Sequence, residues 1–144
     1  MRAKTTFIFF PGNDTPNSVR AAVAVYWITF SVFFVRFVLQ VGVPPFSNSK
    51  EAEAAITLFG LFLAVLIFYA FTITRLSDGK RWARYVALFS TALAITTTLY
   101  SLFAHGLSSE QNNVVGVISV AAETVAGLFL LTPESSAWFK SKIK

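Results

Sequence analysis

The chain has 144 residues, of which 55% are hydrophobic, 16% are aromatic and only 13% are charged. An ordinary soluble protein carries roughly 25% charged residues, so this composition excludes a water-soluble globule and indicates a protein whose surface is solvated by lipid. The chain has no cysteine and a single histidine, which argues against a disulfide framework and against a protein-built zinc or haem site. We therefore expect no metal and no cofactor.

Four apolar stretches of spanning length follow one another along the chain, at residues 19–43, 54–74, 82–104 and 114–132. At 1.5 Å per residue, roughly 20 residues cross the ~30 Å hydrocarbon core of a bilayer. Backbone groups in lipid must be hydrogen-bonded internally, and the alternating pattern of a barrel is absent. We predict an all-α fold, in which residues 1–144 form a single integral membrane domain: a four-helix transmembrane bundle.

The segments between and after these stretches carry turn and capping residues. Prolines at 44–45 stop the first helix, and the run Ser-Asp-Gly at 77–79 predicts a tight turn. Thr132 followed by Pro133 resembles a helix start, with threonine as the cap and proline in the first helical position. We predict a short interfacial C-terminal helix there, with Trp138 and Phe139 in the membrane interface.

The positions of lysine and arginine predict the orientation. Ten of the twelve fall on one side of a four-helix arrangement, namely Arg2, Lys4, Arg20, Arg75, Lys80, Arg81, Arg84, Lys140, Lys142 and Lys144. The opposite side holds only Lys50, and Arg36 lies within the first span. Because basic residues stay in the cytoplasm, both termini are predicted to be cytoplasmic (N-in/C-in). The net charge of +5 is explained by topology, so we predict no nucleic-acid partner. Four of these residues are predicted to contact anionic lipid headgroups: Arg75, Lys80, Arg81 and Arg84.

Arg36 is a charged residue within a membrane span, seven residues before the predicted outer end at 43. A charge at the centre of a spanning helix costs about 2.5–3.5 kcal/mol on insertion scales, so such residues face protein or water. At 100° per residue, Arg36 and Gln40 each lie within about 20° of Thr29. This spacing predicts a polar stripe on the first helix.

Glu123 is the acidic counterpart, near the middle of the fourth span. Its helix face carries small residues that let a neighbouring helix approach closely: Gly116, Ser119, Ala126 and Gly127. Arg36 and Glu123 differ in predicted depth by about one helical turn. We therefore predict that helices one and four are neighbours and that the two side chains form an intramembrane polar pair, supported by Thr29, Gln40 and Ser119.

Three roles for this pair stay open at the level of sequence. A buried pair can fix helix register while adding little net stability, because desolvation offsets attraction. Arg36 can instead extend to the outer phosphates while Glu123 is protonated. The pair can also act in function, as an ion or proton relay or as a docking point for a partner helix.

Small and hydroxylated residues elsewhere predict packing between helices. In the third span Thr91 and Thr98 share a face with Ala87, and in the second span Gly60 and Ala64 form a small-residue patch. Both patterns are typical of close helix contacts in membranes, so we expect both to lie in the core.

Two motifs carry a resemblance. The segment Gly-Lys-Arg-Trp-Ala-Arg at 79–84 opens the third helix, and Leu-Thr-Pro-Glu-Ser-Ser-Ala-Trp-Phe at 131–139 closes the fourth. The chain in this respect resembles a loose group of small bacterial four-helix inner-membrane proteins of unknown function. The resemblance implies a bacterial inner membrane and carries over no active site.

The sequence contains no nucleotide-binding loop, nucleophile elbow or metal-ligand spacing, and its outer loops are short. We therefore expect a protein that is not an enzyme and that binds membrane lipids and another membrane protein or a second copy of itself. An accessory subunit and an immunity-type protein against a membrane-inserting toxin both fit. The alternative is a small oligomeric transporter or channel that uses Arg36 and Glu123.

Overall fold

The computed structural model describes residues 8–41, 48–106 and 111–142. In this part of the chain all regular structure is helical and no strand occurs, which confirms the all-α prediction. The helices are α1 (Asn17–Val41), α2 (Ser49–Ser77), α3 (Arg81–His105), α4 (Gln111–Leu131) and α5 (Pro133–Ser141). Helices α1 to α4 are each long and apolar enough to cross a bilayer, so the chain is a multi-pass membrane protein by length and composition.

The second helix begins earlier than the apolar stretch alone predicts. It starts at Ser49 instead of residue 54, because the side chain of Asn48 caps it. Asn48 Oδ1 accepts a hydrogen bond from the backbone N–H of Glu51 at 2.9 Å, which satisfies a donor that the first turn leaves unpaired. The predicted end of the first span at 43 and the stop at 44–45 lie outside the described residues.

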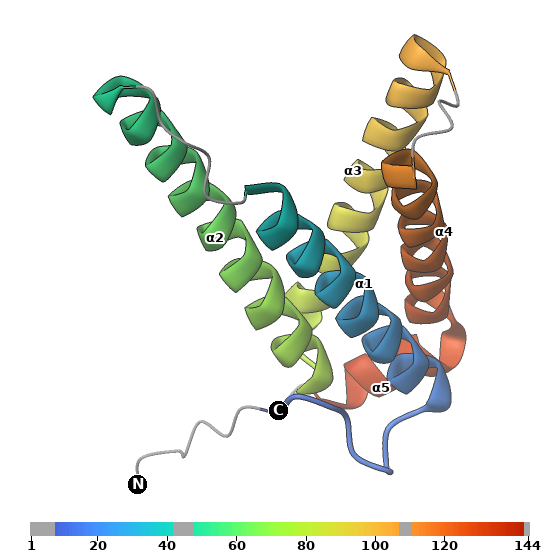
Figure 1. Ribbon diagram of the computed structural model, residues 1–144. Helices are drawn as coiled ribbons and strands as arrows, with labels where there is room; N and C mark the ends of the chain where they lie inside the picture. The colour runs from blue at the N-terminus through green and yellow to red at the C-terminus, as the bar shows by residue number, and fades with distance from the viewer. Residues whose placement is uncertain (1–7, 42–47, 107–110, 143–144) are drawn as a thin grey trace, which may run out of the picture.

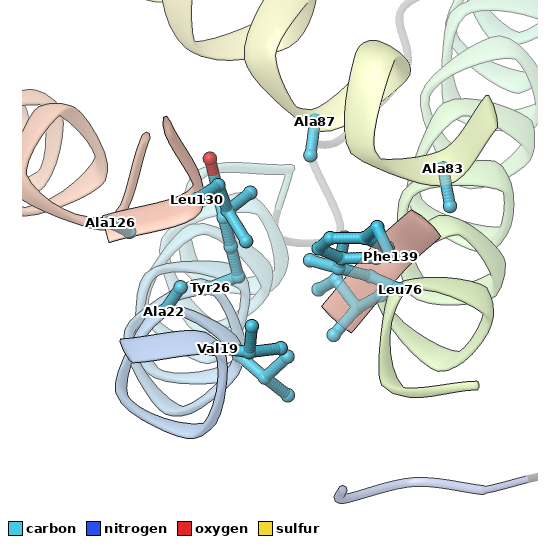
Figure 2. Close-up of a cluster of buried hydrophobic side chains, with 11 residues drawn as sticks. Val19, Ala22, Tyr26, Leu76, Ala83, Ala87, Ala126, Leu130 and Phe139 are labelled. Carbon is cyan, nitrogen blue, oxygen red and sulfur yellow. The ribbon is translucent and has the colours of Figure 1, made fainter. Parts of the chain in front are cut away.

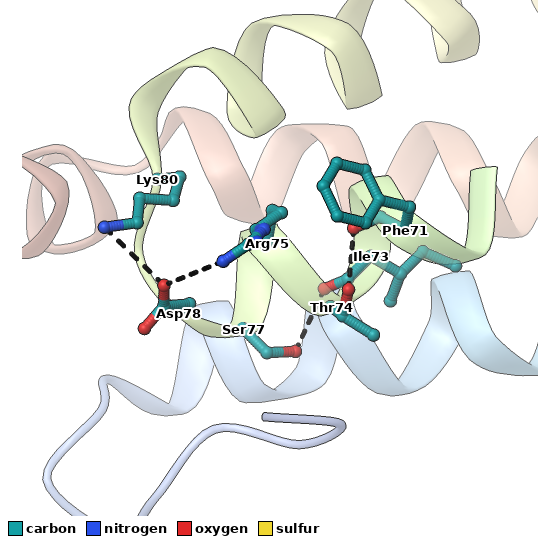
Figure 3. A network of polar contacts seen from close by, with 7 residues as sticks. All are labelled: Phe71, Ile73, Thr74, Arg75, Ser77, Asp78 and Lys80. Atoms are coloured by element: carbon teal, nitrogen blue, oxygen red, sulfur yellow. Dashed lines mark hydrogen bonds and ion pairs between the residues drawn. The ribbon is translucent and has the colours of Figure 1, made fainter. Parts of the chain in front are cut away.

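The turn between α2 and α3 has the geometry of a Schellman motif, and Figure 3 shows the polar side-chain contacts around it, including those of Asp78. The N–H of Gly79 donates to the carbonyl of Leu76 at 3.0 Å, and the N–H of Lys80 donates to that of Arg75 at 3.0 Å. Gly79 takes a φ of +76°, a left-handed value that suits glycine. Asp78 lies between Arg75 at 3.8 Å and Lys80 at 3.6 Å. The tight turn predicted at 77–79 is confirmed.

The start of α5 also follows the predicted pattern. Thr132 is the N-cap, its hydroxyl oxygen accepts from the N–H of Ser135 at 3.3 Å, and Pro133 occupies the first turn. Ser135 is fully buried, donates to the carbonyl of Phe129 at 2.7 Å and lies 2.9 Å from the hydroxyl of Ser18 on α1. These bonds hold α5 against the ends of α4 and α1.

The four long helices pack in the order α1–α2–α3–α4, and α4 returns to α1 (Figure 1). The contact between α1 and α4 is the most extensive, which confirms that these two helices are neighbours. The contact between α2 and α3 is the smallest of the four. In Figure 1 the helices converge at the end where α5 lies and diverge toward the opposite end. The first and last described segments meet at the α5 end, where Lys142 lies 3.7 Å from Asp14.

The main cluster of buried side chains lies at the convergent end (Figure 2), and Phe37 and Leu66 are buried outside it. Four alanines let the helices approach closely, and larger side chains fill the space between them. The core residues are Val19, Ala22, Val23, Tyr26, Ile73, Leu76, Ala83, Ala87, Ala126, Leu130 and Phe139. Phe139 is fully buried beside Leu76 instead of lying in the membrane interface as predicted, because α5 turns its aromatic face under the helix ends.

The two predicted small-residue patches, on α3 and on α2, differ in burial. Ala87 and Thr91 on α3 are buried as expected. Gly60 on α2 is exposed, and a Cβ added there would meet nothing within 4 Å. The prediction that Gly60 lies in the core is therefore wrong, because Gly60 faces open space, whereas Phe59 and Phe62 beside it on α2 contact Phe37 of α1.

Gly79→Ala is expected to destabilise the protein. The left-handed backbone costs a non-glycine residue about 1–2 kcal/mol, and the new Cβ would lie 2.8 Å from Lys142 Cγ and 3.1 Å from Trp138 Cη2. Gly60→Ala is the matched control, because this helical glycine has open space around it, and it should be neutral or stabilising by up to ~1 kcal/mol. Thermal unfolding of the two variants in the same detergent compares them. Equal stability would contradict the turn geometry.

Phe139→Ala should lower the free energy of unfolding by about 3–5 kcal/mol, because it leaves a cavity between α5 and the convergent helices. Phe103→Ala removes the same ring from α3 at a position that is 88% exposed, and it should change stability by less than ~0.5 kcal/mol. Unfolding followed by circular dichroism measures both. A small effect at Phe139 would place α5 outside the folded core.

Candidate functional site

A cleft of about 600 Å³ lies between the four long helices, on the divergent side of the core. Its walls are mainly apolar, with a small number of polar side chains. The polar lining residues are Thr29 and Arg36 on α1, Tyr69 on α2, Ser90, Thr97 and Thr98 on α3, and Ser119 and Glu123 on α4. Clefts of roughly 300–1,000 Å³ with apolar walls and few polar groups are typical of ligand sites.

Glu123 and Tyr69 form the polar floor of this cleft. The hydroxyl of Tyr69 donates to Glu123 Oε1 at 3.3 Å. Thr29 lines the same cleft, and its hydroxyl donates to the carbonyl of Tyr26 at 3.1 Å. Tyr69 and Glu123 each stand eight residues before the end of a helix, and α2 and α4 run in the same direction. The two residues therefore lie at the same depth, about 12 Å from the convergent helix ends.

A second tyrosine closes the floor below. Tyr26 is fully buried, and its hydroxyl lies 2.9 Å from the hydroxyl of Thr91 on α3. The rings of Tyr26 and Tyr69 meet edge to face, with 6.5 Å between their centroids. Gly127 on α4 faces the bonded hydroxyls of Tyr26 and Thr91. A Cβ added at Gly127 would lie 3.5 Å from Thr91 Cγ2 and 3.9 Å from the hydroxyl oxygen of Tyr26. The convergent core seals the cleft at this end.

Serine and threonine side chains on the walls are hydrogen-bonded to their own helices. Ser90 donates to the carbonyl of Val86 at 2.9 Å, Thr97 donates to that of Leu93 at 3.0 Å, and Ser119 donates to that of Val115 at 2.8 Å. With their protons engaged, these hydroxyls offer mainly acceptor lone pairs to anything in the cleft.

Arg36 lies at a different level from Glu123. A Cβ added at Gly116 would lie 3.9 Å from Arg36 Nη1, so the guanidinium sits beside Gly116. Gly116 is seven residues from Glu123 along α4, which is about two turns or ~10 Å. A second cavity of about 270 Å³ adjoins the cleft here, shares Arg36 and Gly116 with it, and extends to Gly106 at the divergent end.

The structure brings most of the predicted polar residues together. Arg36, Glu123, Thr29 and Ser119 all line the one cleft. The side chain of Gln40 lies outside what the structure describes. Direct pairing of Arg36 with Glu123 stays a prediction.

The basic residues near the α2–α3 turn make several protein contacts. Arg75 and Lys80 flank Asp78, as described above. Arg84 Nη2 donates to Ser136 Oγ at 2.7 Å, and its guanidinium lies over the Phe139 ring at 5.4 Å. Arg81 is exposed. Their contact with lipid headgroups stays a prediction.

Tyr69 is the site residue that sequence reasoning missed. A tyrosine deep in an apolar span needs a hydrogen-bond partner for its hydroxyl. This requirement could have indicated that Tyr69 contacts a polar residue of another span. Its depth matches that of Glu123 once the helix ends are known. The cleft-lining phenylalanines carry no such signal, because the chain contains 16 phenylalanines distributed over all spans.

Comparisons with models of protein families, with curated proteins and with solved structures find no match to this chain. Among the described residues, no group of three or more metal-ligating side chains is arranged to hold an ion. The site is therefore interpreted from its geometry and chemistry.

A double-mutant cycle should detect coupling between Tyr69 and Glu123. Tyr69→Phe and Glu123→Gln each disturb the hydrogen bond, and the coupling energy is expected to be about 0.6–1.7 kcal/mol, the range for such bonds in membrane helices. The matched cycle combines Arg36→Gln with Glu123→Gln, and its coupling should be smaller because the Arg36 guanidinium lies beside Gly116, seven residues before Glu123 on α4. Unfolding in detergent measures both cycles. A larger coupling for Arg36 would establish the predicted ion pair instead.

Proposed function

We propose that this chain is a small inner-membrane protein that works without catalysis, by binding another membrane component in the cleft between its helices. The observation that supports the proposal is the cleft itself, with walls from all four long helices and a polar floor at Tyr69 and Glu123. Ionisable residues within membrane spans are expensive to bury and mark functional pathways or binding sites.

The proposed orientation places the convergent end and both termini in the cytoplasm, with the four helices as an N-in/C-in bundle. Basic residues gather at that end, in the α2–α3 turn and on α5, whereas Lys50 lies at the divergent end. The positive-inside rule supports this orientation. The motifs at 79–84 and 131–139 support a bacterial inner membrane. Exposed Lys140 gives the amphipathic α5 a surface for anionic headgroups.

The partner in this proposal is a membrane protein, as expected for an accessory subunit or an immunity-type protein, or a component of the lipid phase. The partner can also be a second copy of this chain. In each case the cleft receives the partner, or a side chain or a single turn of it, within the bilayer, because the walls of the cleft are formed by the four long helices.

A second candidate function is transport by an oligomer. The observation that favours it is the adjoining cavity, which continues the cleft past Arg36 toward Gly106. Polar groups therefore extend from mid-membrane to the divergent end. The core closes the opposite end, so this arrangement corresponds to access from one side of the membrane.

Photo-cross-linking in native membranes tests the binding proposal. A benzophenone amino acid in place of Leu93, which lines the cleft and is 55% exposed, should form an adduct of defined mass. The same group in place of Leu128, which is 60% exposed and lies outside the cleft, is the matched control. We expect an adduct that is several-fold more abundant from position 93, because only that position faces a bound component.

Mass spectrometry identifies whether the adduct is a protein, a second copy of the chain or a smaller molecule. Identical adduct patterns from positions 93 and 128 would contradict the proposal, because they would reflect ordinary contact with bulk lipid. Directional uptake into vesicles containing the purified protein would support transport instead.

A further inference from the structure

The volume of the cleft limits the size of its occupant. A helix about 10–12 Å wide fills roughly 400–600 Å³ per turn, and a spanning helix of about 20 residues has more than five turns. The cleft of about 600 Å³ therefore accommodates little more than one turn of a partner helix. It has the capacity expected for a single small molecule.

The position of the opening indicates where that molecule comes from. The buried residues of α2 and α3 are concentrated near their shared turn, and the two helices diverge beyond it (Figure 1). The cleft residues Val65 and Phe68 on α2 are 54% and 53% exposed, and Phe89 on α3 is 69% exposed. These apolar edges face the hydrocarbon at mid-depth. The cleft is thus accessible from within the bilayer, and its ligand is a molecule that dissolves there.

The charge at the floor indicates the chemistry of the ligand. Glu123 is the acidic residue that lines the cleft, and its carboxylate is oriented by Tyr69. Three phenylalanines and Tyr69 lie on the surrounding walls, and aromatic faces attract cations. The wall hydroxyls add acceptors. The opposing charge, Arg36, lies about two turns away beside Gly116 and faces the adjoining cavity as well.

We propose that the cleft binds a membrane-soluble organic cation, an ammonium-type or phosphonium-type centre on an apolar body, with Glu123 as the counter-ion and entry between α2 and α3. This inference rests on the proposed function, because it names the class of component that the cleft receives. The apolar body contacts the aromatic and aliphatic walls, and the positive centre lies at the floor. Arg36 disfavours a second cation toward the divergent end.

Binding of two ions of the same shape and opposite charge tests the inference. Purified full-length protein in lipid nanodiscs is equilibrated with labelled tetraphenylphosphonium or tetraphenylborate, and empty nanodiscs supply the background. We expect saturable binding of the cation, with at least about tenfold preference over the anion. Equal binding of the two ions, or preference for the anion, would overturn the assignment without the use of any variant.

Substitutions then locate the site. Glu123→Gln should weaken cation binding at least about tenfold, because the counter-ion is lost. Glu53→Gln, at an exposed glutamate near the start of α2, is the matched control and should change affinity by less than about twofold. Leu93→Trp keeps every charge but narrows the cleft, so it should also weaken binding. If Glu123→Gln does not fold, Leu93→Trp and the comparison of the two ions still decide the question.

Failure of this inference differs from failure of the proposed function. If neither ion binds but position 93 still gives a specific adduct, the cleft is a binding site and the ligand class is wrong. If no ion binds and positions 93 and 128 give identical adducts, both proposals are wrong. Cation binding that survives both Glu123→Gln and Leu93→Trp would place the site elsewhere.

Discussion

The packing of α5 beneath the four long helices is the constraint on which the rest of the structure depends. Phe139 and Ser135 are fully buried, and Ser135 is bonded to the last turn of α4 and lies within hydrogen-bonding distance of Ser18 on α1. Together with the alanine-lined core, these two residues hold all four helices together at one end, whereas α1 also contacts α2 nearer the other end through Phe37 and Phe59. In water the divergent ends would expose a large apolar area. In lipid this exposure carries little penalty, because the hydrocarbon is as apolar as the side chains. The cleft is therefore compatible with a stable fold in a membrane.

The polar floor stands at the boundary between this core and the cleft. Tyr26 faces inward and is bonded to Thr91, whereas Tyr69, one ring contact away, faces the cleft and is bonded to Glu123. A carboxylate at this depth needs donors, because desolvation without compensation is costly. Tyr69 supplies one from α2. The contact that joins α2 to α4 thus also orients the candidate binding group, so fold and site are energetically coupled.

Much of this arrangement could be predicted from sequence, for identifiable reasons. Span length and apolar content are local properties, and they located α1 to α4 to within a few residues. Capping is also local, so the turn at 77–79 and the start of α5 at Thr132 were predicted correctly. Depth in the membrane can be counted along a helix, and both Arg36 and Glu123 line the cleft, but their pairing stays a prediction. Rotation and tilt depend on contacts between distant residues. For that reason the burial of Phe139, the exposure of Gly60 and the partnership of Tyr69 with Glu123 were not predicted.

The unequal closure of the two ends bears on the choice between binding and transport. The cleft and the adjoining cavity extend from Glu123 past Arg36 to Gly106 at the divergent end. Transport across the membrane would require the opposite end to open, with separation of Tyr26 from Thr91 and displacement of Phe139 from the core. Binding requires none of these changes, because the floor is complete and the edges of α2 and α3 already face the hydrocarbon. The arrangement of charge agrees with this, because Glu123 lines the cleft beside Tyr69, and Arg36 lies toward the adjoining cavity.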